Sequence, residues 1–217
     1  MKFYLITLLL ISTNIFSEYK NTSGDALNKS FSDIVKWIRA ENNTVVSAIE
    51  LSSEWKNINL TEDDNYTIWI GHSTFLIKTD GVTILTDPIF SDRASPFSSI
   101  GPKRLIPPSM NISDLPNIDF VTVSHNHYDH LDIPTLKKLS KLNPNTVFLI
   151  PAGDLNLLNR KGIKNAFEFK WWESFNDKGF TFTFTPVQHW SKRGLFDRNK
   201  SLWGGWYIEH DKYSLYH

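Results

Sequence analysis

The sequence contains no cysteine among its 217 residues. This absence excludes disulfide bonds, a thiolate nucleophile and cysteine-bound zinc, so any metal ion must be held by nitrogen and oxygen ligands. An excess of charge is also absent, because 23 Lys and Arg residues balance 23 Asp and Glu residues and no long run of one sign occurs. Electrostatic attraction to nucleic acid or to anionic lipid is therefore not predicted.

The remaining composition is typical of a globular protein. Hydrophobic residues make up 41% of the chain and aromatic residues 14%, and the length is sufficient to bury a sizeable core. The sequence shows neither an internal repeat nor a low-complexity segment. We therefore expect one main domain with an additional segment before it.

The first residues, MKFYLITLLLISTNIFSEYK, carry one lysine followed by an apolar stretch from Phe3 to Phe16. A helix that spans a membrane needs about 20 apolar residues, which is more than this stretch offers. The pattern resembles a secretory signal and predicts a signal peptide at residues 1–17, with export to the periplasm or a membrane surface. Ile15 stands where a small residue is preferred, so no cleavage site is assigned. The alternative is a buried apolar segment of a cytoplasmic protein.

Residues 18–60 are rich in Asn, Ser and charge, and we expect an N-terminal extension with one helix there. The helix is predicted in FSDIVKWIRAE, where apolar residues recur at helical spacing at Phe31, Ile34, Val35 and Ile38. The main domain is predicted to cover residues 61–217.

Strand patterns dominate this domain. Residues 66–90 hold two apolar, β-branched segments joined through Thr79, Asp80 and Gly81, which predicts paired strands, and the proline-rich residues 90–110 predict a long ordered loop. Further strands are expected at DFVTVS, NTVFLIPAG, NAFEF and FTFTFT and on both sides of a turn near Asp211. Helices are expected at DIPTLKKLSKL, opened by Asp132, and at DLNLLNRKG, opened by Asp154. The mixture indicates an α/β (α+β) fold.

Three histidines and an aspartate lie within the six residues HNHYDH, positions 125–130, directly after a predicted strand. In an extended chain, residues two apart project to one side, so His125 and His127 can reach the same ion. Asp129 and His130 follow where the backbone turns, and they can face a second position nearby. Imidazole and carboxylate groups bind zinc, iron or manganese. The alternative is a surface loop that caps the next helix, but four ligand-type residues in six favour a metal site.

The pattern His125-x-His127-x-Asp129-His130 resembles the signature of the metallo-β-lactamase superfamily. Residues 65–217 also resemble the N-acyl-phosphatidylethanolamine-hydrolysing phospholipase D family and its bacterial relatives. The segments that carry this resemblance are, in order, TIWIGHSTFLI, TDPIFSDRASPFSSIGPKR, ISDLPNIDFVTVSHNHYDHLD, KWWES, FTPVQHWSKR and LWGGWYI. The resemblance implies a metallo-β-lactamase-like αββα sandwich.

The resemblance also implies a site for two zinc ions. His125, His127 and His189 would hold one ion, while Asp129 and His130 would hold the second. Asp129 would in addition be the catalytic carboxylate. His189 lies just beyond a predicted strand, and loops at strand ends often carry functional residues.

Three other features each have two interpretations. Asp87 matches a family aspartate that holds a ligand histidine from behind the metals, but it is equally well explained as a turn residue before Pro88. His72 also matches the family pattern, but a structural histidine explains it as well, and we assign it no role. The tryptophans either line a lipid groove or fill the core, and the core is favoured because aromatic side chains bury a large area; they are Trp171, Trp172, Trp203 and Trp206.

The implied activity is hydrolysis of the phosphodiester in N-acyl-phosphatidylethanolamine, which releases phosphatidic acid and an N-acylethanolamine. Two metal ions about 3.5–4 Å apart can share a water, lower its pKa and hold the oxygens of a phosphoryl group. The substrate would be a phospholipid, reached through peripheral contact with a membrane, or another small molecule. Hydrolysis of a lactone, a sugar phosphate or another ester is the alternative.

The sequence departs from the family pattern after KYSLYH. The family continues there with a Gly-Asp-Thr-Gly-like turn, whose aspartate bridges the metals, and later with a further ligand histidine. We therefore expect a sandwich with an incomplete second half, exposed apolar sheet surface and one or two bound zinc ions. Two hypotheses remain: a hydrolase completed by a C-terminal fragment, and a truncated, non-catalytic remnant that binds one metal.

Overall fold

The computed structural model describes residues 19–24, 32, 36, 51–62 and 65–217. The predicted signal peptide at residues 1–17 and most of the helix predicted within FSDIVKWIRAE lie outside this part of the chain. Residues 51–62 contain a short 3-10 helix, η1 (Glu54–Asn57). The first β-strand of the described chain begins at Tyr66.

The larger sheet has six strands in the order β1-β2-β3-β4-β5-β6. Its antiparallel part consists of β1 (Tyr66–Gly71), β2 (Thr74–Thr79) and β3 (Val82–Thr86). Three strands continue from β3 in parallel, namely β4 (Phe120–Thr122), β5 (Val147–Pro151) and β6 (Ala166–Phe169). Parallel neighbours need crossover connections, and these contain η2 (Ile112–Asp114), α2 (Ile133–Leu142) and α3 (Leu155–Arg160).

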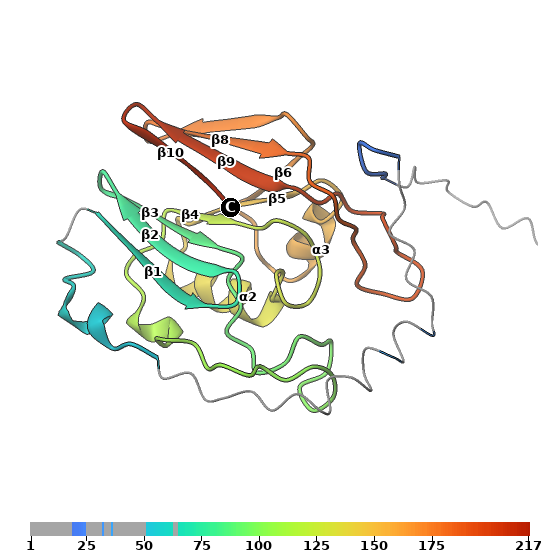
Figure 1. Ribbon diagram of the computed structural model, residues 1–217, viewed down its shortest axis with the longest axis horizontal. Helices are drawn as coiled ribbons and strands as arrows, with labels where there is room; N and C mark the ends of the chain where they lie inside the picture. Colours follow the sequence, from blue (N-terminus) through green and yellow to red (C-terminus); the bar gives the residue numbers. More distant parts are fainter. Residues whose placement is uncertain (1–18, 25–31, 33–35, 37–50, 63–64) are drawn as a thin grey trace, which may run out of the picture.

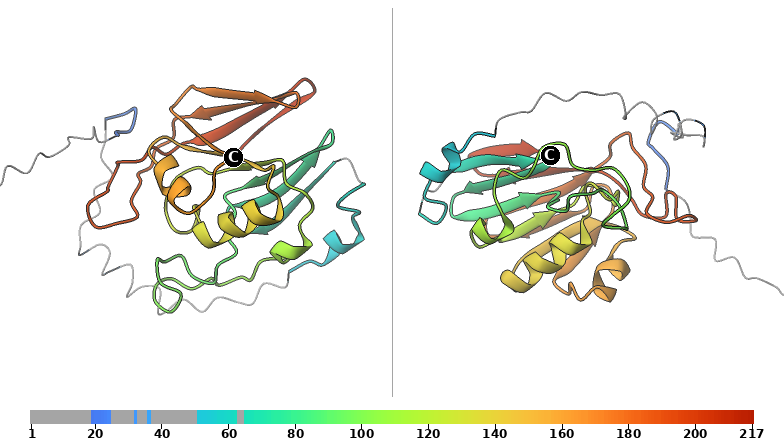
Figure 2. Two further views of the ribbon diagram at one scale, coloured as in Figure 1. Left: turned by 180° about the vertical axis from the view of Figure 1, so that it is seen from behind. Right: turned by 90° about the horizontal axis from the view of Figure 1, so that it is seen from below.

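The smaller sheet is antiparallel and has the order β10-β9-β8-β7. Its strands are β7 (Ser174–Asp177), β8 (Phe180–Thr185), β9 (Gly205–His210) and β10 (Tyr213–Tyr216). It lies over one face of the six-stranded sheet, while α2 and α3 cover the opposite face (Figures 1 and 2). The described domain is therefore layered as helices, sheet and sheet.

The alternation of Phe and Thr in β8 divides this strand between the core and the surface. Phe180, Phe182 and Phe184 are buried between the two sheets, where Phe182 packs against Phe120 with ring centroids 4.7 Å apart. A second apolar cluster, which includes Leu136 of α2, fills the space between the helices and the larger sheet. Each face of the six-stranded sheet is thus covered by its own core.

The tryptophans divide between core and surface. Trp203 and Trp206 are fully buried, and Trp206 donates from Nε1 to the carbonyl of Val123 at 2.9 Å. Trp171 is half-buried, whereas Trp172 is 70% exposed. The interpretation as core therefore applies to Trp203 and Trp206 and is wrong for Trp172.

Most predicted elements are confirmed, with two corrections. Residues 66–86 form three strands instead of two, because the chain reverses at His72 and Ser73 as well as at Asp80 and Gly81. Strand β7 was not predicted, because its sequence SFND lacks the apolar alternation that marks a strand. The proline-rich residues 90–110 form an irregular loop, as expected, whose one β-bridge joins Arg93 to Lys103.

No helix of the described residues covers the outer face of the four-stranded sheet, so three layers of an αββα sandwich are described. The expectation of an apolar surface is wrong for this face. Cross-strand pairing places mainly hydroxyl-bearing and charged side chains there: Thr181, Thr183, Thr185, Tyr207, Glu209, Ser214 and Tyr216. Water can solvate such a face directly.

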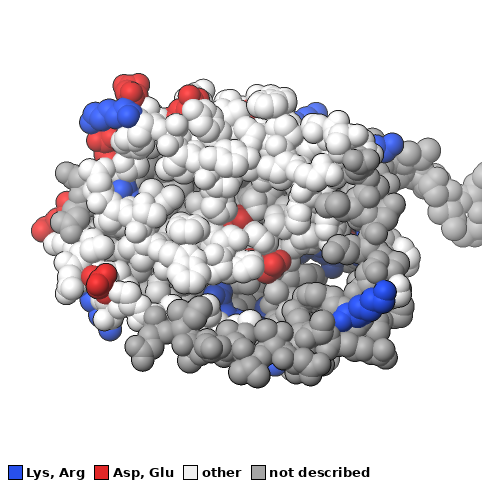
Figure 3. Space-filling view, in the orientation of Figure 1, with Lys and Arg blue, Asp and Glu red and all other residues white. Residues whose placement is uncertain are grey.

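Charged side chains are scattered over the face seen in Figure 1, and they lie mainly toward its margins (Figure 3). Within the part of the chain that the structure describes, no helix is both long and apolar enough to span a membrane. The longest described helix, α2, has 10 residues.

Replacing Phe182 by Ala should lower the free energy of unfolding by about 3–5 kcal/mol, because the substitution opens a cavity between the two sheets. Thr183→Ala is the matched control on the outer face of the same strand and should cost less than about 1 kcal/mol. Urea denaturation followed by circular dichroism measures both values. Equal losses for the two variants would contradict this assignment of faces.

Candidate metal centre

The histidine-rich loop begins where the central strand β4 ends. After Thr122 the backbone stays extended, and the amide of Val123 still donates to the carbonyl of Leu149 on β5. The chain then turns, because the amides of His130 and Leu131 both donate to the carbonyl of His127, at 3.1 and 2.8 Å. The two histidines in the extended part and the two ligand-type residues in the turn therefore face different positions, as their spacing predicted.

The first cluster consists of His125, His127 and His189. One side-chain nitrogen of each lies within 4.8 Å of the others, and the Nε2 atoms of His125 and His189 are 3.0 Å apart. His189 comes from the loop after β8, 64 residues further along the chain. The Nε2 atom of His127 is buried and has no hydrogen-bond partner among the described residues. A buried nitrogen of this kind is costly unless it binds a ligand.

The protonation of this cluster favours a cation. Burial lowers the pKa of His125, and it lowers the pKa of His127 to about 4. Burial, together with the positive charge of His130, also lowers the pKa of His189. The three imidazoles are therefore neutral near pH 7, and a neutral imidazole has the lone pair that a metal requires.

Ser124 fixes which nitrogen of His125 carries that lone pair. The Ser124 hydroxyl donates to Oδ2 of Asp87 at 2.5 Å, so its oxygen accepts from Nδ1 of His125 at 2.9 Å. Because neutral imidazole has one N–H, the Nε2 atom of His125 is left unprotonated on the side that faces His189. The ligand nitrogen thus points into the first cluster.

The second cluster consists of His72, Asp129 and His130. Oδ2 of Asp129 lies 3.2 Å from Nε2 of His72 and 3.7 Å from Nε2 of His130. Burial raises the pKa of Asp129, but the hydrogen bond from His72 and the charge of His130 outweigh it and lower the pKa to about 2. The carboxylate is therefore ionised at neutral pH and offers a hard oxygen ligand.

Asp87 lies fully buried behind His130. It accepts hydrogen bonds from Nδ1 of His130 at 2.6 Å and from the Ser124 amide at 2.7 Å. Burial raises the pKa of Asp87, but the charge of His130 and its hydrogen bond outweigh burial. The pKa is lowered overall, so the carboxylate stays ionised. Burial lowers the pKa of His130, and the charge of Asp87 outweighs this and raises it. The contact orients the His130 ring so that Nε2 faces Asp129.

The structure thus brings together all the residues that the sequence singled out for metal binding, and it adds His72. This histidine occupies the turn between β1 and β2 with a positive φ of 51°, and the indole of Trp69 donates to its carbonyl at 2.8 Å. Its resemblance to the family pattern was the only signal in the sequence. The fold brings the β1–β2 turn to Asp129, which places His72 in the second cluster.

The two clusters fit metal ions by their donor sets. Three neutral imidazoles suit zinc or a neighbouring transition metal, and a carboxylate with two imidazoles suits a second, harder position. The described residues around both clusters also supply the orienting contacts that metal-binding histidines generally need, from Ser124 and Asp87.

Fold and site together define a metal-binding protein of the metallo-β-lactamase fold. Residues 82–217 match the family model described as the beta-lactamase superfamily domain, so the chain belongs to this family. The match includes His125, His127, Asp129, His130 and His189.

Among characterised relatives, the chain is 41% identical over 165 residues to N-acyl-phosphatidylethanolamine-hydrolyzing phospholipase D 1 of Caenorhabditis elegans. The alignment covers 69% of this chain and 46% of that protein. The mitochondrial enzyme of the same name from Saccharomyces cerevisiae is 37% identical over 150 residues, which cover 67% of this chain and 31% of the yeast protein. The chain therefore spans less than half the length of these relatives.

Solved structures agree on the fold. Igni18, a metallo hydrolase from Ignicoccus hospitalis, superposes with a TM-score of 0.51 at 22% identity, over 70% of this chain and 58% of that one. An isothiocyanate hydrolase from Delia radicum gut bacteria gives a TM-score of 0.51 at 18% identity, over 69% of this chain and 60% of that one.

Asp87→Ala should weaken zinc binding about 10–100-fold, because His130 and Ser124 would lose the carboxylate that orients them. Isothermal titration of the metal-free protein with zinc measures the affinity. Asp80→Ala is the matched control, since Asp80 is an aspartate of the β2–β3 turn that contacts Lys212 and Tyr213 away from both clusters. An unchanged zinc affinity in Asp87→Ala would show that the contact does not support metal binding.

Proposed function

We propose that this domain is a metal-dependent hydrolase whose first ion is zinc, bound by His125, His127 and His189. The observation that carries the proposal is the convergence of three neutral imidazoles from two distant segments, with one nitrogen of each within 4.8 Å of the others. Asp129 and His130 are proposed to hold a second ion, with His72 beside them. When bound, such ions lower the pKa of a water and polarise a phosphoryl or carbonyl oxygen.

The side chains around the clusters then have separate tasks. Ser124 keeps the proton of His125 on Nδ1, and Asp87 keeps His130 turned toward Asp129. Asp129 is the ionised carboxylate next to both His72 and His130, and we assign it the catalytic role of accepting a hydrogen bond or a proton at Oδ2.

The proposed substrate is a phospholipid of the N-acyl-phosphatidylethanolamine type. Support comes from the two relatives named for this reaction, which are 41% and 37% identical to the chain. Cleavage of the phosphodiester on the ethanolamine side would release phosphatidic acid and an N-acylethanolamine. Hydrolysis of a different ester or lactone is the alternative within the same chemistry.

A phospholipid substrate requires contact with a membrane, and the β8–β9 loop offers a suitable surface. Leu195 and Phe196 are 83% and 85% exposed, and they follow His189 in the same loop. Lys192 and Arg198 flank them in the sequence. Two apolar side chains between cations suit the interface of a bilayer, where apolar groups enter the acyl region and cations meet phosphates. We propose peripheral contact at this loop, on the exported side if residues 1–17 act as a signal.

A second candidate is a non-catalytic domain that binds one metal. The difference between the clusters supports this candidate. The first cluster has three neutral imidazoles, whereas the second has one carboxylate and two imidazoles, and the pKa of one of these, His130, is raised. Metal stoichiometry separates the two candidates: two ions per chain support the hydrolase, and one ion supports the alternative.

The purified chain loaded with zinc should hydrolyse N-acyl-phosphatidylethanolamine in mixed micelles, and a chelator should abolish the activity. His125→Ala should lower kcat/KM by at least about 100-fold, because it removes a central ligand of the first ion. Release of the N-acylethanolamine, followed by mass spectrometry, measures the rate.

The matched control is His210→Ala, which removes an imidazole near the β9–β10 turn, where it contacts Asp80 outside both clusters. It should keep close to full activity. A zinc-loaded wild-type protein that cleaves none of the phosphodiester, ester or lactone substrates would contradict the hydrolase proposal.

Replacing Leu195 and Phe196 together by Ser should reduce binding to phosphatidylcholine vesicles containing anionic lipid by about 10-fold or more, since it removes the exposed apolar pair. Vesicle sedimentation measures the bound fraction. Leu142→Ser, which removes an exposed leucine at the end of α2, should leave binding unchanged. Equal binding by all three proteins would eliminate this loop as the membrane contact.

A further inference from the structure

Asp154 stands at the first position before α3, but its carboxylate does not serve that helix. An aspartate at a helix start normally accepts hydrogen bonds from the first free amides. In the described structure no such bond forms. Asp154 is nevertheless only 2% exposed. A buried carboxylate without a capping role needs another explanation.

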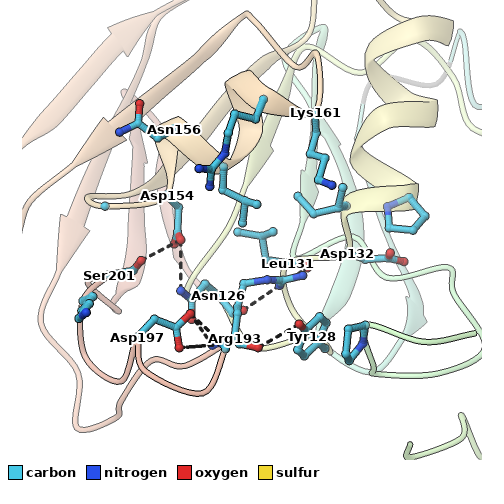
Figure 4. A pocket seen from close by; sticks show the side chains of 18 of the residues that line it. Asn126, Tyr128, Leu131, Asp132, Asp154, Asn156, Lys161, Arg193, Asp197 and Ser201 are labelled. Atoms are coloured by element: carbon cyan, nitrogen blue, oxygen red, sulfur yellow. Dashed lines mark hydrogen bonds between the residues drawn. The ribbon is translucent and has the colours of Figure 1, made fainter. Parts of the chain in front are cut away.

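The carboxylate is directed at the histidine-rich loop. Oδ1 of Asp154 accepts from the side-chain amide of Asn126 at 3.1 Å and from the hydroxyl of Ser201 at 2.8 Å (Figure 4). Asn126 lies between the proposed ligands His125 and His127, and it is 3% exposed. Asp154 therefore contacts the metal-binding loop at its centre.

Asn126 also contacts the segment that carries His189. Its Oδ1 atom accepts from the backbone amide of Lys192 at 3.1 Å, and Lys192 is three residues beyond His189. An asparagine side chain can donate and accept at once, so it joins an acceptor on one side to a backbone donor on the other. The hydrogen bonds from Asn126 to Asp154 and from Lys192 to Asn126 thus connect the start of α3 with both segments that bear the three imidazoles.

The neighbouring contacts act on the same two segments. Arg193 donates from Nη1 to the carbonyls of Asn126 at 2.8 Å and Leu131 at 2.7 Å, and its guanidinium lies 4.0 Å from the Tyr128 ring centroid. These bonds hold the backbone of the loop, but they do not contact the side-chain amide of Asn126. The Asp154 carboxylate accepts from the nitrogen of that amide, while the Lys192 N–H donates to its oxygen.

We propose that Asp154 is a positioning residue of the first metal cluster: through Asn126 it fixes His125 and His127 relative to His189. This inference rests on the proposed metal binding. Metal ligands must be held within a few tenths of an ångström, and a rotated Asn126 would release Lys192 and the His189 segment together.

The burial of Asp154 is consistent with such a role. Its Oδ2 atom is buried without a hydrogen-bond partner within the described structure, and burial raises the pKa of the carboxyl group to about 6. Asp154 also lines a cavity of about 1000 Å³, together with Asn126 and Arg193 (Figure 4). A leucine or alanine would be less costly to bury here, so the acceptor oxygen is what the site requires.

The test is zinc affinity, measured by competition with a chromogenic chelator. Asp154→Ala should bind zinc about 10-fold more weakly than the wild-type protein. Asp154→Asn keeps an acceptor oxygen for Asn126 and Ser201, so it should stay within about 2-fold of the wild-type affinity. The cobalt-loaded proteins give a second readout, because the visible absorption of cobalt reports the ligand geometry and should change in Asp154→Ala alone.

Two controls separate positioning from general destabilisation. Asp119→Ala removes a carboxylate that accepts from the Thr83 amide at the opposite end of β4, and it should leave zinc affinity unchanged. In an Asn126→Ala background, Asp154→Ala should cause no further loss, because the connection is already broken. If Asp154→Ala fails to fold, the single variants Ser201→Ala and Asn126→Ala take its place, and each is compared with Asp154→Asn.

Wild-type affinity in Asp154→Ala, equal losses in Asp154→Ala and Asp154→Asn, or additive losses with Asn126→Ala would each overturn the inference while leaving the proposed function intact. Absence of zinc binding by the wild-type protein would instead overturn the proposed function, and this inference with it.

Discussion

The contact of the buried Asp87 carboxylate with Ser124 and His130 is the one on which the rest of the site depends. Asp87 directly follows β3, and both partners follow the neighbouring strand β4, so the contact fixes two strand ends against each other. An isolated buried carboxylate would be strongly unfavourable, and the donors around Asp87 offset that cost. The same contact directs the Ser124 hydroxyl, which in turn sets the tautomer of His125. One buried charge therefore determines the orientation of ligand-type residues in both clusters.

The sheets set the distances over which these residues meet. His189 reaches His125 because β8 and β9 pair over the larger sheet and the loop between them returns to its strand ends. The amide of Gly204 donates to the carbonyl of Ser124 at 3.0 Å. A Cβ at this glycine would lie 2.5 Å from the carbonyl oxygen of Thr185 and 2.6 Å from the Phe184 ring, so no larger residue fits. The second ligand segment is thus held close to the first by backbone contact.

The sequence predicted the parts of this arrangement that are local in the chain. HNHYDH follows a buried strand and precedes a helix, and the spacing of its residues alone separates the extended pair from the pair in the turn. The Phe and Thr alternation of β8 predicted both a half-buried strand and the side of it that enters the core. These patterns are reliable because each depends only on how side-chain direction repeats along one continuous segment of the chain.

The remaining features depend on contacts between distant segments, which leave no local pattern. His72 lies in a turn with positive φ, and only the folded chain brings that turn to Asp129. Asp154 was predicted to open a helix, and it does precede α3 directly. Its carboxylate, however, accepts a hydrogen bond from Asn126, 28 residues earlier. Strand β7 is polar and forms because β8 offers it a partner. In each case tertiary contact decided what local preference left open.

The protonation of the first cluster explains why a cation belongs there. Burial keeps three imidazoles neutral, and the buried Nε2 of His127 has no hydrogen-bond partner among the residues described. The Nε2 atoms of His125 and His189 also lie at hydrogen-bond distance, although the tautomer of His125 places a lone pair there. The His127 nitrogen is costly to bury in this state, because a buried polar atom without a partner loses its hydrogen bond to water. A divalent ion would bind a nitrogen of each of the three imidazoles, so the free energy of metal binding would also stabilise the fold that holds the two segments together.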